Sequence, residues 1–311
     1  MSKILITGGA GFIGYHLSQK LRPSNHVDLI DELSPLKLAS VRRAHLLENL
    51  TKESILNPFL SNHNFRPDIL IHLAAETGIS GSLADPRLYF KTNVEGTINV
   101  LEECRKNGVK YLIYASSSSV YSNGQRITSE DSDTSCQLSF YGTSKKMSEV
   151  MVENYCRQFG ITAIGLRFFT VYGSFTRPDM AAYKFMSAIN DNKKISLYNN
   201  GEVYRDFTHV SDVVNSIELL THKIKELPFG SHEIFNIGLG KPMSVKYYAE
   251  QIAMNLNKEF SFNAPKLPKN ELVSTHSDTA KLTNFINYKP IMTLEDGIKE
   301  MVNWYKLERY D

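Results

Sequence analysis

The segment YGTSK, residues 141–145, places a tyrosine and a lysine four positions apart. On a helix, side chains with this spacing lie on one face. A lysine ammonium close to a phenol stabilises the phenolate, which lowers the pKa of the phenol and suits Tyr141 to act as a general base near neutral pH. An ordinary Tyr141 and Lys145 on a solvated helix face would have the same spacing, so the rest of the sequence decides between these readings.

A run of four serines, Ser116–Ser119, directly follows the apolar segment Tyr111–Ala115, which we expect to be a strand. In open α/β sheets, ligands bind beyond the carboxyl ends of parallel strands. A serine hydroxyl at that position could hydrogen-bond the same substrate oxygen as Tyr141. The alternative is a serine that only caps the turn after the strand.

The segment TGGAGFIG contains Gly8, Gly11 and Gly14 directly after a short β-rich run and at the start of a helical pattern. Residues without a Cβ at such a turn let backbone N–H groups approach a pyrophosphate, and the N-terminus of the helix adds positive potential. A tight turn without a ligand is the alternative, but the position after the first strand favours a dinucleotide site.

Asp31 ends the second apolar run, about twenty residues after the glycines, where an acid can accept hydrogen bonds from ribose hydroxyls. A carboxylate there repels a 2′-phosphate, so the sequence predicts NAD rather than NADP as the cofactor. In a competing interpretation Arg42 or Arg43 binds a 2′-phosphate, but both lie well beyond the expected strand end.

Short apolar runs alternate with helical patterns through the first half of the chain. The expected strands are Lys3–Thr7, Val27–Ile30, Ile69–Leu73, Tyr111–Ala115 and Thr162–Phe169, and the expected helices are Phe12–Leu21, Leu88–Arg105 and Tyr141–Phe159. This alternation predicts an α/β fold with a Rossmann-type, doubly wound parallel sheet. Strands without polar alternation indicate a sheet that is covered on both faces.

Turn residues become frequent after Gly173, and helical stretches remain near residues 179–191, 211–223, 244–255 and 294–305. We therefore expect two parts. Residues 1–170 form an NAD-binding domain that carries the Ser, Tyr and Lys, and residues 171–311 form a smaller, mixed α/β substrate-binding lobe. The chain is expected to cross back to the first domain around residues 200–240.

The composition is that of a soluble globular protein, with 311 residues, 42% hydrophobic and 22% charged residues and a formal net charge of +2. This balance gives no electrostatic basis for binding nucleic acid, and no apolar run approaches the roughly 20 residues that a membrane span needs. Cys104, Cys136 and Cys156 are too few and too scattered for a disulfide framework or a metal site. We expect a cytoplasmic protein with reduced thiols and no metal.

The glycine turn, the acid, the serine run and the YxxxK segment occur in an order that resembles the extended short-chain dehydrogenase/reductase superfamily, which holds NAD-dependent nucleotide-sugar epimerases and dehydratases. The resemblance covers essentially the whole chain and implies that Ser117, Tyr141 and Lys145 form a catalytic triad. The positions that match its cofactor-binding pattern are Gly8, Gly11, Phe12, Ile13, Asp31, Leu73, Ala74, Ala75, Asn93, Tyr141 and Lys145. Asn93 matches a structural Asn of the long helix, and Asn49 stands where many members have an adenine-binding Asp.

Dehydratases and decarboxylases of this superfamily typically have a carboxylate pair or a Ser-Glu pair just before VYG, where this chain has Ser118 and Ser119. Without a carboxylate there, abstraction of a proton at C5 of the sugar lacks an obvious base. The resemblance therefore favours 4-epimerisation, in which hydride leaves C4 and returns to its other face while Tyr141 handles the proton of the 4-hydroxyl.

The stretch GLRFFTVYGSFTRPDMAAYKF closely resembles UDP-glucuronate 4-epimerases. Thr170 stands where hexose 4-epimerases usually have Asn, and Arg177 could hold a carboxylate through two hydrogen bonds. We expect Ser118, Ser119, Thr170 and Arg177 to hold the carboxylate in an orientation that disfavours loss of CO2 from the oxidised intermediate. An Arg177 on a surface turn is the alternative.

Other positions match the superfamily's substrate site. Arg205 matches a diphosphate ligand, while Asp206 and Asp212 are more simply structural. Phe185, Leu197 and Tyr198 are candidates to sandwich a uracil, with a plain core role as the alternative, and Glu271 replaces a usual late Asp. Three departures have no explanation in the sequence: Ser80 replaces a substrate-side Arg, Ser122 replaces a Gly, and Ser174 replaces a Pro.

The preferred reading is a UDP-uronic acid 4-epimerase. The alternatives are a 4-epimerase of a neutral or N-acetylated UDP-hexose, another nucleotide-sugar oxidoreductase such as a 4-keto reductase, and a non-catalytic NAD-binding regulator. The helical patterns Leu88–Arg105 and Tyr141–Phe159 resemble those that form a four-helix dimer interface in this superfamily, so we expect a homodimer.

Overall fold

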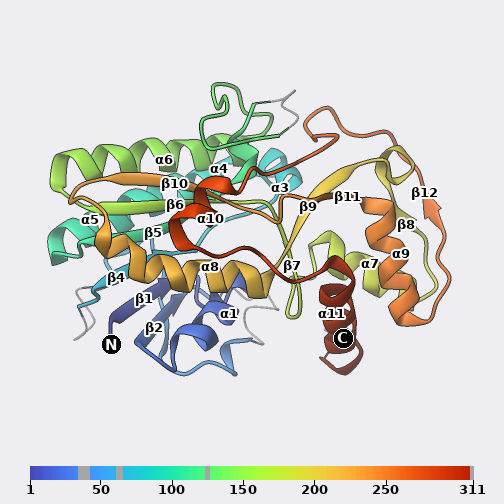
Figure 1. The fold of residues 1–311 in the computed structure, drawn as a ribbon, viewed down its shortest axis with the longest axis horizontal. Coiled ribbons are helices and arrows are strands. Elements are labelled where there is room, and N and C mark those ends of the chain that lie inside the picture. Colours follow the sequence, from blue (N-terminus) through green and yellow to red (C-terminus); the bar gives the residue numbers. More distant parts are fainter. Residues whose placement is uncertain (34–42, 61–65, 123–126, 309–311) are drawn as a thin grey trace.

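The larger of the two parts of the molecule is built around a parallel β-sheet (Figure 1). The computed structural model describes residues 1–33, 43–60, 66–122 and 127–308, and within them the sheet has seven strands in the order β10-β6-β5-β4-β1-β2-β3. The strands are β1 (Lys3–Thr7), β2 (His26–Asp31), β3 (Leu50–Lys52), β4 (Ile69–His72), β5 (Tyr111–Ser117), β6 (Thr162–Phe168) and β10 (His232–Ile237). All neighbouring pairs are parallel, so the predicted Rossmann-type sheet is confirmed.

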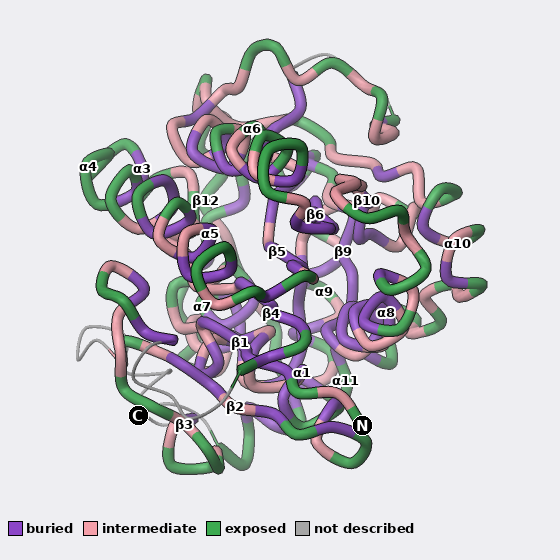
Figure 2. The backbone as a smooth tube through the Cα atoms, turned by 90° about the vertical axis from the view of Figure 1, so that its left-hand side faces the viewer, coloured by how far each residue is buried: buried purple, intermediate pink, exposed green. Residues whose placement is uncertain are grey.

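Helices cover both faces of this sheet, which explains why its strands are continuously apolar. Ile4 and Ile6 of β1 belong to the apolar cluster that includes residues of α1 (Phe12–Leu21) and α8 (Val210–Lys223). Leu5, between them, belongs to the cluster that includes residues of α5 (Gly96–Asn107) and α6 (Phe140–Phe159). Successive side chains of a strand point to opposite faces, and the central strands are correspondingly buried in Figure 2.

The helical pattern predicted at Leu88–Arg105 begins earlier and is not one regular helix. It consists of α4 (Pro86–Tyr89), a π-helical segment η2 (Phe90–Glu95) and α5. Asp85 caps the first of these, since its side chain accepts a hydrogen bond from the Leu88 amide at 3.0 Å. A π-helical turn inside a longer helix often marks a functional site, and here it carries Asn93.

The smaller lobe surrounds a short mixed sheet, in which β9 (Tyr204–His209) pairs in parallel with β7 (Thr170–Tyr172) and antiparallel with β11 (Pro242–Ser244). Its other elements are α7 (Ala181–Asn190), α9 (Val245–Leu256), α11 (Leu294–Glu308) and the paired short strands β8 (Ile195–Ser196) and β12 (Phe262–Asn263). Aromatic packing fills its core, where Phe207 stacks on Tyr248 with ring centroids 4.3 Å apart.

The second half of the chain also contributes to the main sheet. After β9, α8 packs on α1, and β10 adds an outer strand beside β6. Later in the chain, α10 (Ala280–Ile286) packs against α8 and β10. The chain thus alternates between the two parts (Figure 1). Short elements such as β3, β8 and α3 (Ile79–Ala84) have too few residues to produce a periodic sequence pattern, and the sequence did not predict them.

Within the described ranges, no helix has both the length and the apolar character that crossing a bilayer requires. Cys104, Cys136 and Cys156 are free thiols.

Candidate active site

The carboxyl end of β5 and the first turn of α6 bring the predicted triad together. The Ser117 oxygen caps the short 3-10 helix η3 (Ser118–Val120) by accepting a hydrogen bond from the Ser119 amide at 3.1 Å. Burial raises the pKa of the Tyr141 phenol, while a hydrogen bond with Ser117 and the charge of Arg177 act in the opposite direction. Ser117 and Tyr141 are therefore neighbours, as the resemblance implied.

Lys145 lies one turn after Tyr141 on α6 and is buried. Its ammonium donates a hydrogen bond to the Ala115 carbonyl at 3.0 Å, which ties the helix to β5. Burial lowers the pKa of Lys145 to about 8, so at neutral pH the side chain is mostly a cation. A buried cation one turn from the phenol is the arrangement that favours a phenolate.

Asn93 lies in the π-helical segment η2 and links two parts of the first domain. Its amide oxygen accepts a hydrogen bond from the Glu76 backbone N–H at 2.8 Å, and its amide nitrogen donates to the Glu76 carbonyl and to Ser144 Oγ, both at 3.0 Å. Asn93 thereby joins the loop after β4 to α6, next to Lys145. These contacts use the amide for positioning, in line with the structural Asn of the resemblance.

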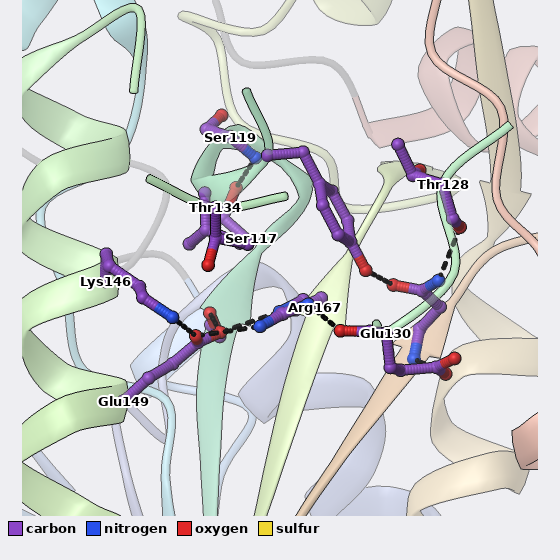
Figure 3. Close-up of polar contacts among 12 residues, drawn as sticks. Ser117, Ser119, Thr128, Glu130, Thr134, Lys146, Glu149 and Arg167 are labelled. Carbon is purple, nitrogen blue, oxygen red and sulfur yellow. Dashed lines mark hydrogen bonds and ion pairs between the residues drawn. The ribbon is translucent and has the colours of Figure 1, made fainter. Parts of the chain in front are cut away.

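A buried ion pair joins α6 to the sheet close to the triad. Glu149, one turn after Lys145, accepts two hydrogen bonds from Arg167 of β6, at 2.8 and 2.9 Å, and one from the Ser116 hydroxyl at 2.7 Å. The two charged side chains are only 4% and 5% exposed. Figure 3 shows Glu149 between Lys146 and Arg167. The ion pair fixes α6 against β5 and β6 at the residue before Ser117.

The same network extends to the outer strand of the sheet. Arg167 donates to the Glu130 carbonyl at 3.0 Å. The Glu130 carboxylate accepts a hydrogen bond from the backbone amide of Asn236, in β10, at 2.7 Å (Figure 3). Asn236 also accepts from the Tyr121 hydroxyl and donates to the Thr128 carbonyl. Sequence reasoning missed this network, because its members come from separate parts of the chain and have no local motif.

The glycine turn is packed too closely against the protein backbone to accept side chains. Gly8 has a φ of +72°, and a Cβ there would lie 2.7 Å from the Ala74 amide nitrogen, while a Cβ on Gly14 would lie 2.2 Å from the Gly8 carbonyl oxygen. Gly11 is the N-cap of α1 and supplies no side-chain cap to its amides. A helix N-terminus without a side-chain acceptor suits the pyrophosphate of NAD. Phe12 and Ile13 lie in the first turn of this helix.

Asp31 lies at the carboxyl end of β2, beside this turn. Its Oδ2 accepts a hydrogen bond from the Ala10 amide at 3.1 Å and its Oδ1 accepts from the Leu33 amide at 3.0 Å. A carboxylate accepts more than two hydrogen bonds, so capacity remains for ribose hydroxyls. Leu73, Ala74 and Ala75 follow β4 and line the other side of the turn, where the Leu73 amide donates to the Thr7 carbonyl.

Arg43 does not serve as a phosphate ligand. Its side chain is 1% exposed, and its guanidinium donates to the Ala10 carbonyl at 2.7 Å and to the Phe175 carbonyl at 2.8 Å. His16 makes a parallel link from α1 to the Ser174 carbonyl at 2.8 Å, and burial lowers the pKa of His16 to about 4, which keeps it neutral. These side chains join the cofactor turn to the smaller lobe. Arg42 lies outside the described residues.

The structure does not bring Asn49 to the cofactor edge. Asn49 precedes β3, and its carbonyl accepts from the Leu29 amide, so it lies toward the amino ends of the strands. Glu53 instead follows β3 and donates its amide to the Asp31 carbonyl at 3.0 Å. Asn49 therefore lies before β3, a three-residue strand that the sequence did not reveal.

Arg177 crosses from the smaller lobe to the loop after β4. Its guanidinium donates to Thr77 Oγ1 and, with two hydrogen bonds of 2.9 and 2.6 Å, to the carboxylate of Asp179. Its charge lowers the pKa of Tyr141, against the larger effect of burial. Ser118, Ser119 and Thr170 are all half-buried. The structure thus places Arg177 close to the triad.

Two of the three unexplained serines have clear contacts. Ser122 Oγ accepts a hydrogen bond from the Cys136 amide at 3.0 Å, and its backbone does not need the conformational freedom of a Gly. Ser174 presents its carbonyl to His16. Ser80 lies exposed in α3, and nothing in the structure explains the loss of an Arg there.

Arg205 of β9 pairs with Glu271 at 3.2 Å and also donates to the Leu272 carbonyl at 2.8 Å. Two other acids of this region hold the backbone. Asp206 accepts from the amides of Leu239, Gly240 and Ser277, and Asp212 accepts from Tyr288 and from the amides of Ile291 and Met292. The structural role expected of both acids agrees with these contacts.

Two of the three candidates for a uracil sandwich lie in the core of the smaller lobe. Phe185 is 7% exposed and Leu197 is fully buried, and both belong to the apolar cluster around Trp304. Tyr198 is 41% exposed. The structure therefore favours core packing for Phe185 and Leu197, because the lobe buries the faces that a base would have to contact.

Known proteins resemble this chain over nearly its whole length. The sequence profile of the NAD dependent epimerase/dehydratase family matches residues 4–238. The chain is 38% identical to an uncharacterised protein of Methanocaldococcus jannaschii, over 99% of this chain and 97% of that protein.

Two solved structures illustrate the range of similar proteins. The UDP-glucuronic acid 4-epimerase of Bacillus cereus, in complex with UDP-glucuronic acid and NAD, aligns with a TM-score of 0.90 and 30% identity over 98% of this chain and 99% of its own. The UDP-N-acetylglucosamine 4-epimerase of Methanobrevibacter ruminantium, in complex with UDP-N-acetylmuramic acid, aligns with a TM-score of 0.87 and 28% identity over 99% of both chains.

Replacing Glu149 by Gln should destabilise the protein by about 3–5 kcal/mol, because Arg167 would remain buried without a countercharge. Urea unfolding followed by circular dichroism measures this loss. The double variant Glu149→Gln/Arg167→Met should recover at least half of it, since neither charge remains. A single variant as stable as the parent would contradict the account.

Replacing Lys145 by Met should stabilise the protein at pH 7 while abolishing activity. The pKa of Lys145 falls from 10.5 to about 8 on burial, so the charged form costs about 3.5 kcal/mol at about 1.4 kcal/mol per unit. The cost is complete below pH 8 and disappears as the pH rises to 10.5, because the unfolded chain binds more protons in that window. Unfolding curves of both proteins at pH 7, 8, 9 and 10 test this; a stability difference that does not shrink with pH would refute it.

Proposed function

This chain belongs to the NAD dependent epimerase/dehydratase family, and on that premise we propose that it converts UDP-glucuronate to UDP-galacturonate by NAD-dependent 4-epimerisation, through a transient 4-keto sugar. The observation that carries the substrate assignment is Arg177, whose guanidinium reaches Thr77 and acts on the pKa of Tyr141. A uronate has its carboxylate on C5, next to the reacting C4. A cation beside the general base matches that ligand.

The residues of the first domain fit NAD as the resident cofactor. When bound, NAD supplies the acceptor for the C4 hydride and the source of its return to the opposite face. The Gly8 turn and the N-terminus of α1 would hold the pyrophosphate, and Asp31 would accept the adenosine ribose hydroxyls. The Asp31 carboxylate disfavours the 2′-phosphate of NADP.

Tyr141 takes the proton of the sugar's 4-hydroxyl and later returns a proton to the same oxygen. The Ser117 hydroxyl hydrogen-bonds that oxygen and orients it toward the phenol. Lys145 is mostly protonated at neutral pH, since its pKa is about 8, and its charge stabilises the phenolate that Tyr141 needs to act as a base. Burial otherwise disfavours that phenolate.

Ser118 and Ser119 support an epimerase rather than a dehydratase, because neither offers a carboxylate that could abstract the C5 proton. The oxidised uronate is a β-keto acid, which loses CO2 readily if its carboxylate can align with the ketone. Ser118, Ser119, Thr170 and Arg177 are suitable donors to hold that carboxylate out of alignment.

The second candidate is a 4-epimerase of a neutral or N-acetylated UDP-hexose. The similarity to an enzyme named as a UDP-N-acetylglucosamine 4-epimerase supports it, as does Ser80, which replaces a substrate-side Arg of the UDP-glucuronate 4-epimerases that the sequence resembles. Arg177 favours the uronate, because a neutral sugar offers no carboxylate to the N–H groups that Asp179 and Thr77 leave unused.

We also propose a homodimer formed through α5 and α6. Several large apolar side chains on these helices and on the adjoining η2 are exposed: Phe90, Ile98, Met147 and Val150. Apolar side chains gathered on neighbouring helices are typical of an interaction surface. A second copy of this chain would cover them from its own α5 and α6.

The substrate proposal predicts that purified protein, without added cofactor, converts UDP-glucuronate to UDP-galacturonate and leaves UDP-glucose and UDP-N-acetylglucosamine unchanged, as followed by NMR. Arg177→Ala should lower kcat/KM for UDP-glucuronate by about a hundredfold, the loss expected for a charged bidentate contact. Conversion of only a neutral sugar, or full uronate activity in Arg177→Ala, would overturn the proposal.

The dimer proposal predicts that Val150→Asp, in the exposed face of α6, shifts the protein from dimer to monomer in analytical ultracentrifugation, because a charge at the interface must be desolvated. Met254→Glu is the matched control, since Met254 is also exposed but lies on α9 of the smaller lobe. A parent protein that sediments as a monomer would refute the proposal.

A further inference from the structure

The hydrogen bonds of Arg177 account for part of its donor capacity. A guanidinium has five N–H donors. In this structure Nε and Nη2 donate to Asp179 Oδ1 and Oδ2, at 2.9 and 2.6 Å, and Nη1 donates to Thr77 Oγ1. Among the residues that the structure describes, these are the acceptors of the guanidinium. Two of its five N–H groups therefore remain without an acceptor there, one on Nη1 and one on Nη2.

We propose that Asp179 is a positioning residue that orients the Arg177 guanidinium for recognition of the substrate carboxylate. This inference rests on the proposed function and extends it to a residue that does not contact the reacting atoms. Asp179 holds the side edge of the guanidinium, formed by Nε and Nη2. One N–H on Nη1 and one on Nη2 then stay available for a second carboxylate.

The backbone around Arg177 restrains the pair. Pro178 separates the two residues and fixes its own φ near −65°, and the Met180 amide donates to the Arg177 carbonyl at 3.1 Å, which closes the turn. A long side chain that is already held by two partners loses less conformational entropy when a ligand arrives. Asp179 therefore improves binding of the carboxylate without touching it.

A second set of contacts relates this turn to the triad. Tyr89 donates its hydroxyl to the Thr77 carbonyl at 2.6 Å, and its ring packs edge-on against the Tyr141 ring with centroids 6.2 Å apart. Thr77, which accepts from Arg177, is thus connected through one side chain to the general base. The sugar's C4 hydroxyl and C5 carboxylate are separated by two carbon atoms, so their ligands must keep a fixed relation.

A different role for Asp179 would be competition. In that case its carboxylate would occupy Arg177 until a substrate displaced it, and removal of its charge would tighten uronate binding. The donor count favours positioning, because a second carboxylate can bind the two remaining N–H groups while Asp179 keeps Nε and the other N–H of Nη2. Asp179 is also 62% exposed, so its charge is largely solvated and repels a second carboxylate only weakly.

The two roles make opposite predictions for Asp179→Asn, which keeps the size of the side chain but replaces one acceptor oxygen by an NH2 group that faces the Arg177 donors. Affinities for UDP-glucuronate and UDP-glucose can be measured by isothermal titration of the NAD-bound protein, with Tyr141→Phe in all samples to prevent turnover. Positioning predicts about tenfold weaker UDP-glucuronate binding in Asp179→Asn and less than a twofold change for UDP-glucose. Asp179→Glu, which keeps the charge, should recover part of the loss.

Unchanged or tighter binding of UDP-glucuronate in Asp179→Asn would overturn the proposal, as would an equal loss for UDP-glucose, which would show general damage to the site. Arg177→Ala in the same experiment separates this inference from the proposed function. If Arg177→Ala weakens UDP-glucuronate binding and Asp179→Asn does not, only the role of Asp179 is wrong. If Arg177→Ala has no effect, the carboxylate site of the proposed function fails as well.

Discussion

The parallel direction of the seven strands is the constraint on which the site depends. Because every strand of the main sheet runs the same way, the ends of β1, β2, β4 and β5 meet at one edge. The glycine turn, Asp31, the loop after β4 and Ser117 follow these ends directly. A cofactor and a substrate that bind at this edge contact residues that are more than a hundred positions apart in the chain.

This arrangement requires a fixed position of helix α6 along strands β5 and β6. The Lys145 contact with the Ala115 carbonyl and the buried Glu149–Arg167 pair do so within two turns of Tyr141. A buried ion pair adds little net stability in comparison with apolar packing, but its hydrogen-bond geometry is specific. In this protein the ion pair fixes the position of the Tyr141 phenol on α6 relative to Ser117 on β5.

The smaller lobe is coupled to the cofactor turn by a few polar side chains. Arg43 and His16 reach the backbone of residues 174–175 from the first domain, and Arg177 reaches Thr77 from the lobe. The segment that would select the sugar is therefore fixed relative to the turn that would bind the pyrophosphate. Buried donors that satisfy backbone carbonyls leave few alternative arrangements for this segment.

The sequence by itself determined the elements whose signal is local. The apolar runs, the glycine turn, the acid after the second run and the YxxxK spacing each lie within one short segment. They were enough to predict the sheet and the cofactor class, and the resemblance to a known superfamily implied the triad of Ser117, Tyr141 and Lys145. Only the tertiary structure decided which distant side chains meet: the burial of Phe185 and Leu197, the exclusion of Asn49 from the cofactor edge, and the pairing of Glu149 with Arg167. These depend on register and packing between segments far apart in the chain, for which a single sequence contains no periodic signal.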